Sequence, residues 1–166
     1  MSITLLPTLK TKSIERKIYV CGFAFSHDFQ KVYLLKKNRP QWQKGLLNGL
    51  GGLVKDGENL FEAMSRKFHE ECGILIDSKN WVQIEFILNE SVTVVFYSAR
   101  LPEGLVPYKT TDEHLWSVYW KNYTQRSWEE MDVVSNVPYL ISKAYNIFTD
   151  NKNDHYVKFE FLTNKT

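Results

Sequence analysis

The sequence predicts an α+β fold, a mixed α/β/α sandwich in which helices cover both faces of a β-sheet. Segments rich in strand-forming residues lie on both sides of a segment with helical periodicity, residues 60–72, and a second amphipathic segment follows at 137–149. The chain has 166 residues, of which 43% are hydrophobic and 14% aromatic. This is enough to bury a proper core, so we expect one globular domain over residues 1–166.

The expected strands are short runs of β-branched and aromatic residues bounded by turn residues. Glycines break one of these runs, which indicates a strand with a tight turn. The strands are expected at residues 17–25, 31–36, 46–54, 81–88, 91–99, 115–120 and 156–162. We expect a hairpin between the first two and an antiparallel pair at 81–99, with loops at 38–45 and 101–112.

The helix at 60–72 is the best-defined element of the sequence. Apolar residues recur in it at helical spacing and are expected to face the core: Phe61, Met64, Phe68 and Cys72. Gly73 is expected to end the helix. On an adjacent strip, the same spacing groups Lys67, Glu70, Glu71 and Ile74. A further short helical turn is expected at 128–131.

Composition excludes several classes of protein. The net charge of +2 is too small to indicate a nucleic-acid surface, so DNA binding is not expected, and the basic run 10–17 reads as a solvated arm. Cys21 and Cys72 lack metal-type spacing and are interpreted as small buried apolar residues. Neither a signal peptide nor a stretch long enough to span a membrane is present, which makes the cytoplasm the default location.

One motif carries most of the functional information. Fixed spacings separate its glycine, acidic, basic and apolar positions, which are Gly52, Glu58, Arg66, Phe68, Glu70, Glu71, Gly73 and Ile74. This pattern resembles the Nudix box, the signature of hydrolases that split a nucleoside diphosphate linked to another group. Every position of the box matches except one. The residue directly after Arg66 should be a glutamate and is Lys67.

The resemblance implies the Nudix fold and a metal site for phosphate chemistry. Glu70 and Glu71 would bind Mg²⁺, or alternatively Mn²⁺, with the Gly52 carbonyl as a backbone ligand; oxygen ligands of this kind suit Mg²⁺. Arg66 would pair with Glu58 and hold the preceding loop against the helix. Taken alone, two adjacent glutamates on a helix are usually only a solvated face, and it is the shared spacing that favours a site.

Lys67 leaves three alternatives open, because a charged lysine can neither bind a cation nor accept a proton. In the first, Asp112 or Glu113, in a loop after the box, supplies the missing carboxylate. In the second, Lys67 binds a substrate phosphate directly. In the third, the domain binds a nucleotide and hardly cleaves it. Loss of a general base typically costs about 10²–10⁴ in rate.

The substrate class follows from a second resemblance. Residues 47–52 are similar to a stretch in the MutT-like Nudix enzymes that hydrolyse oxidised purine nucleoside triphosphates, with Leu47 in place of a tryptophan. The resemblance implies that Asn48 contacts the base and that Asp112 and Glu113 read it. A turn role for Asn48 and a solvated loop for the two acids are the alternatives. A third similarity lies at 154–159.

The expected function is therefore hydrolysis of a nucleoside triphosphate, most simply a purine one, to monophosphate and pyrophosphate with Mg²⁺. The partner is a small nucleotide. A nucleotide-binding module without turnover is the main alternative. Hydrolysis of an RNA cap is a further one, and it is not favoured because it would need a basic groove that the net charge does not indicate.

Overall fold

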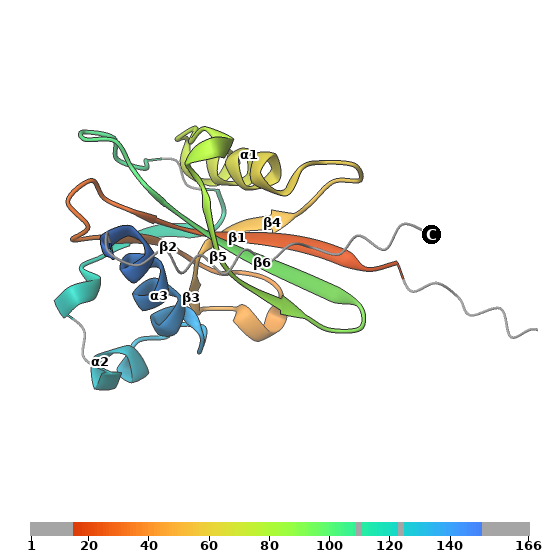
Figure 1. Ribbon diagram of the computed structural model, residues 1–166. Helices are drawn as coiled ribbons and strands as arrows, with labels where there is room; N and C mark the ends of the chain where they lie inside the picture. The colour runs from red at the N-terminus through yellow and green to blue at the C-terminus, as the bar shows by residue number, and fades with distance from the viewer. Residues whose placement is uncertain (1–14, 109–110, 123–124, 151–166) are drawn as a thin grey trace, which may run out of the picture.

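The computed structural model describes residues 15–108, 111–122 and 125–150. Its strands form one seven-stranded sheet, with α1 on one face and α3 on the other (Figure 1). The predicted α+β class is confirmed. The strands are β1 (Lys17–Phe25), β2 (Val32–Lys36), β3 (Leu47–Asn48), β4 (Leu50–Leu53), β5 (Val82–Leu88), β6 (Val92–Arg100) and β7 (His114–Val118). The helices are α1 (Leu60–Cys72), α2 (Gln125–Glu130) and α3 (Val137–Thr149), with single 3-10 turns at Gln41–Gln43, Ser78–Asn80 and Trp120–Asn122.

The strand β1 organises the sheet. It pairs antiparallel with β2 and β4, and parallel with β6 along its whole length. The path through the sheet is β3-β2-β1-β6-β5, with β7 paired to β2. The antiparallel β5–β6 hairpin was expected from the sequence and is confirmed. The parallel pairing of β1 with β6 was not, because it joins segments far apart in the chain.

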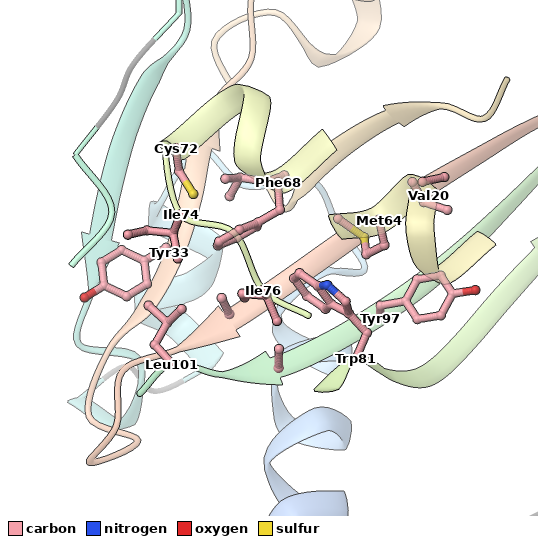
Figure 2. Close-up of a cluster of buried hydrophobic side chains, with 14 of the residues drawn as sticks. Val20, Tyr33, Met64, Phe68, Cys72, Ile74, Ile76, Trp81, Tyr97 and Leu101 are labelled. Atoms are coloured by element: carbon pink, nitrogen blue, oxygen red, sulfur yellow. The ribbon is translucent and has the colours of Figure 1, made fainter. Parts of the chain in front are cut away.

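The core between α1 and the sheet is built from the apolar side of the helix (Figure 2). Met64, Phe68 and Cys72 are fully buried there, as the helical spacing predicts. The prediction was wrong for Phe61, which is 36% exposed. Phe61 lies in the first turn at the margin of the core, where its ring meets Tyr97 edge-on with 5.1 Å between the ring centroids.

A second core fills the space between the sheet and α3. Leu140, Ile141 and Ala144 face it from the helix, and Phe23 and Phe25 face it from β1. Apolar side chains on both faces explain why β1 reads as a nearly continuous hydrophobic run, as expected for a central strand covered on both sides.

Local chemistry sets the ends of α1. The Asn59 side chain accepts hydrogen bonds from the backbone N–H groups of Phe61 (2.9 Å) and Glu62 (3.4 Å), which caps the first turn. Gly73 ends the helix with a φ of 79°, a left-handed conformation that glycine adopts without strain. The predicted bounds of α1 and α3 are confirmed, whereas the turn expected at 128–131 is the helix α2.

Some expectations fall outside the described residues: the strand at 156–162, the similarity at 154–159 and most of the basic run at 10–17. Both cysteines are buried, and burial raises the pKa of each thiol to about 12, consistent with their predicted role as apolar residues. Among the described helices, none has the length and apolar character to cross a membrane.

Candidate functional site

The loop before α1 is fixed to the helix by one ion pair. Arg66 Nε donates to Glu58 Oε1 at 2.6 Å, and Arg66 Nη2 donates to Glu58 Oε2 at 2.8 Å. The second nitrogen also donates to the Leu53 carbonyl at 3.2 Å, so one guanidinium joins β4, the loop and α1. These hydrogen bonds from Arg66 lower the pKa of Glu58 to about 2. The pair expected from the motif is therefore present in the structure.

Glu70 is held on both sides by cationic groups. Its Oε1 accepts from Arg66 Nη1 at 3.1 Å, and its Oε2 accepts from Lys67 Nζ at 3.0 Å. Burial alone would raise the pKa of Glu70, but the hydrogen bonds from Lys67 and Arg66 bring it below its ordinary value. Both oxygens of a carboxylate that was expected to bind metal are therefore engaged by side chains of the same helix.

Lys67 lies across Gly52 and does not extend into solvent. A Cβ at position 52 would collide with Lys67 Cε and would lie 3.0 Å from Lys67 Nζ. The side chain is 23% exposed, so most of it is covered and part of it remains accessible to solvent. The ammonium thus stands between two groups that the motif assigns to metal binding, Gly52 and Glu70.

Glu71 is the carboxylate with the most unusual environment. Its Oε2 accepts a hydrogen bond from the backbone N–H of Gly51 at 2.8 Å. Burial raises the pKa of Glu71 to about 7, against the opposing effect of the Lys37 ammonium and, more weakly, of Lys67. A carboxyl group that titrates near neutral pH can exchange a proton under physiological conditions.

Glu113 is buried, so the solvated-loop interpretation is wrong for this residue. Only 4% of it is exposed. One oxygen accepts from Lys37 Nζ at 2.7 Å and the other from the backbone N–H of Asn38 at 2.8 Å. This buried pair joins the end of β2 to the start of β7, close enough to Glu71 to affect its titration.

Sequence analysis did not single out Lys37. A signal was available, because Tyr33, Leu35 and Lys37 alternate along one strand and its continuation. Tyr33 and Leu35 belong to the core under α1, so Lys37 shares their face. A charged residue on a core-facing position requires a partner. Glu113 is that partner.

Asp112 and Asn48 are placed differently from Glu113. Asp112 is exposed, and its carboxylate lies 3.5 Å from the Arg39 guanidinium. The Asn48 amide donates to Gln43 Oε1 at 3.0 Å and accepts from the Gly49 N–H at 2.8 Å. Asn48 lies at the end of the strand β3, paired with Leu35, and not in a turn, and contact with a base stays a prediction for both residues.

The donor set fits a single divalent ion better than a cluster. Among the described residues, no three side chains of the His, Cys, Asp or Glu type are grouped as a metal site. At Glu70 a cation would have to bind beside the positive charges of Arg66 and Lys67. Glu71 keeps one oxygen without a hydrogen-bond donor in this part of the chain, and Mg²⁺ commonly takes one or two carboxylates together with substrate phosphates.

Comparison with known proteins gives a fold. No protein-family model and no curated protein sequence matches the chain. Among solved structures, a MutT protein from work on Aliivibrio salmonicida and Vibrio cholerae superposes with a TM-score of 0.59 at 22% identity, covering 80% of this chain and 99% of that one. The MutT Nudix hydrolase of Burkholderia pseudomallei gives a TM-score of 0.60 at 17% identity, covering 78% and 98%.

This chain has the Nudix fold. The Nudix domain of Shewanella oneidensis NrtR, solved with ADP-ribose, is also similar, with a TM-score of 0.59 at 19% identity over 81% of this chain and 89% of that one. Identities this low establish the Nudix architecture and leave the chemistry to the residues of the chain. In this chain the helix α1 carries the motif, and Lys67 is the residue that departs from the Nudix pattern.

Proposed function

We propose that the chain is a Nudix hydrolase that converts a purine nucleoside triphosphate, ordinary or oxidised, to monophosphate and pyrophosphate with Mg²⁺, slowly because of Lys67. The observation that carries this proposal is the clamp made by Arg66 on Glu58 and Glu70. It fixes the loop and the helix in one frame, which keeps the carboxylates of Glu70 and Glu71 at the edge of β4.

The reaction breaks the bond between the α- and β-phosphates, with a water oxygen forming the new bond to phosphorus and pyrophosphate leaving. Catalysis of such a transfer consists mainly of positioning and charge neutralisation. When bound, Mg²⁺ would neutralise phosphate charge, and Glu71 with Glu70 would hold it. The water must also lose a proton, and Glu113 has both oxygens engaged by Lys37 and Asn38.

Glu71 is therefore the carboxylate left for two tasks, ion binding and proton acceptance, with the exposed Asp112 as the alternative acceptor. If one group serves both tasks, the site has no separate general base. Turnover should then be slower by about 10²–10⁴ than in a site with such a base. Asn48 and Asp112 are proposed to face the base, and the buried Glu113 is proposed to act on it only through the position of Lys37.

A second candidate is a nucleotide-binding module without turnover. The Lys67–Glu70 pair favours it, because it occupies a carboxylate that catalysis would use. The NrtR Nudix domain binds ADP-ribose, which has the same diphosphate linkage, and thus offers a second class of ligand. Cleavage of an RNA cap is not favoured on the charge of the chain.

The test is product analysis with ATP, GTP, 8-oxo-dGTP, ADP-ribose and a capped RNA, in Mg²⁺, at neutral and alkaline pH. Monophosphate and pyrophosphate from one triphosphate support the proposal. Lys67→Glu should then raise turnover by up to about 10²–10⁴, whereas Lys67→Met, which removes the charge and adds no carboxylate, should raise it much less. If folded wild-type protein and folded Lys67→Glu both release no product from any compound of the panel, only the binding module would remain.

A further inference from the structure

Lys67 has the same neighbours that the motif gives to a metal ion. Its stem lies on Gly52 and its ammonium is 3.0 Å from Glu70 Oε2. Its charge also acts on Glu71, where it weakly opposes the rise in pKa that burial causes. The three neighbours come from a strand and from the last turn of α1. A single cationic atom thus lies among the strand glycine and the two carboxylates of the motif.

The ammonium also retains binding capacity. An ammonium group has three N–H donors. Glu70 uses one of them, and no other acceptor for Lys67 occurs among the residues that the structure describes. The side chain is 23% exposed, so a ligand can approach it from the solvent side.

An ordinary surface ion pair is the alternative explanation of this contact. Lysine and glutamate three residues apart on a helix often form such pairs, which contribute little free energy. Gly52 distinguishes the two cases. The lysine stem lies in space that only a glycine leaves open, against the neighbouring strand, whereas a surface pair would extend along the helix.

The net charge of the motif side chains also favours a role for Lys67 in phosphate binding. Glu58, Glu70 and Glu71 carry three negative charges when ionised, and Arg66 and Lys67 carry two positive ones, which leaves one net negative charge. Glutamate at position 67 would leave three. A polyphosphate would then approach a strongly repulsive surface unless metal ions neutralised it, whereas the present surface is nearly balanced.

We propose that the Lys67 ammonium is a built-in cation that binds a nucleotide phosphate in place of one divalent ion, so that nucleotide binding here does not require metal. The inference rests on the proposed function, because it assumes a nucleotide phosphate at this face of α1. Metal would then be needed for turnover and not for nucleotide affinity. In a site where metal alone holds the phosphates, removal of the metal would abolish both.

Calorimetry with the α,β-methylene analogues of ATP and GTP tests this, because these ligands cannot be cleaved between the α- and β-phosphates. Wild-type protein should bind one analogue in EDTA within about threefold of its affinity in Mg²⁺. Lys67→Met should lose about tenfold or more of the affinity in EDTA, and Lys67→Glu should bind only when Mg²⁺ or Mn²⁺ is added.

Lys79→Met is the matched control, since it removes one exposed lysine that pairs with Asp77 at 3.5 Å and occupies no position of the motif. It should leave the affinity in EDTA unchanged. Unchanged melting temperatures would show that the variants are folded.

Three results would overturn the inference: loss of wild-type binding in EDTA, wild-type affinity in Lys67→Met, or no binding of either analogue under any condition. If the first or second occurs while wild-type protein still releases pyrophosphate from a triphosphate, the proposed function survives and only the role of Lys67 fails. Absence of both binding and product would remove the proposed function as well.

Discussion

Arg66 binds Glu58 through two parallel hydrogen bonds, from Nε at 2.6 Å and from Nη2 at 2.8 Å, and the same guanidinium reaches Glu70 and the Leu53 carbonyl. A planar group with several donors in fixed directions is suited to this task. The side chains of Arg66 and Glu58 are 23% and 15% exposed, so water competes only partly with the pair. The frame of the site thus depends on the shape of the guanidinium as well as on its charge.

Arg66→Lys should therefore destabilise the protein although the charge is kept. A lysine cannot bind both oxygens of Glu58 and also reach Leu53 and Glu70. We expect a loss of about 1–3 kcal/mol in the free energy of unfolding, measured by denaturant titration. Arg39→Lys is the control, because its 3.5 Å contact with Asp112 is exposed and should contribute nothing measurable. Equal stability of the two variants would contradict the role of the paired hydrogen bonds from Arg66 to Glu58.

The neighbouring glycines Gly51 and Gly52 should respond differently to alanine. A Cβ at Gly51 would collide with the Val20 carbonyl oxygen in β1, which is backbone and cannot move aside, so Gly51→Ala should cost about 3 kcal/mol or more. A Cβ at Gly52 would meet only the flexible end of Lys67. Gly52→Ala should therefore cost less than about 1 kcal/mol in thermal or chemical unfolding.

The Gly52→Ala variant also reports on Lys67. Displacement of the lysine should weaken nucleotide binding in EDTA, and adding Gly52→Ala to Lys67→Met should have little further effect. Additive losses in the double variant would show that the two residues act separately.

Without nucleotide, metal should stabilise Lys67→Glu and hardly affect the wild type, in which substrate phosphates would supply part of the ligand set. Glutamate at position 67 would bring a further carboxylate to Glu70 and Glu71, so the variant should melt below the wild type in EDTA. Saturating Mg²⁺ would bind the folded variant and raise its melting temperature by about 5 °C or more. Differential scanning fluorimetry with a Mg²⁺ series gives the comparison, with Lys67→Met as a control that has no added carboxylate. A melting temperature of Lys67→Glu that is independent of Mg²⁺ would show that these carboxylates do not form a metal site.

The sequence predicted those parts of the fold that depend on local chemistry. The bounds of β1, α1 and α3 match, because apolar periodicity, the Asn59 cap and the Gly73 stop act within a few residues. The parallel pairing of β1 with β6 could not be predicted in the same way. It joins residues 75 positions apart, such as Lys17 and Val92, so no pattern within a few residues specifies it.

In the site too, some contacts lie within one stretch of sequence and others join distant segments. The resemblance to the Nudix box implied the Glu58–Arg66 pair, and the structure contains it within one loop and the helix that follows. The position of the Lys67 side chain depended on a strand that passes the helix, and the burial of Glu113 depended on Lys37 from another strand. A contact between distant segments therefore engages Glu113, whereas Glu70 is engaged by Arg66 and Lys67 of its own helix, and the motif alone predicted neither arrangement.

Stability should depend on pH through Glu71. Burial raises its folded pKa to about 7, whereas an unfolded chain has a pKa near the ordinary value of about 4.3. A raised folded pKa means that the folded state retains a proton that the unfolded state releases. The stabilising contribution is thus complete below about pH 4 and is lost as the pH rises through 7.

Glu71→Gln has no carboxyl group to ionise and can still accept the hydrogen bond from Gly51. In metal-free buffer, the stability of the variant relative to wild type should therefore increase between pH 5 and pH 8, by on the order of 1–3 kcal/mol. Chemical denaturation at several pH values measures the difference. Glu62→Gln, on the exposed first turn of the same helix, should show no such trend. A constant difference between Glu71→Gln and wild type over this range would mean that Glu71 titrates as an ordinary glutamate, and its proposed part in proton transfer near neutral pH would lose its basis.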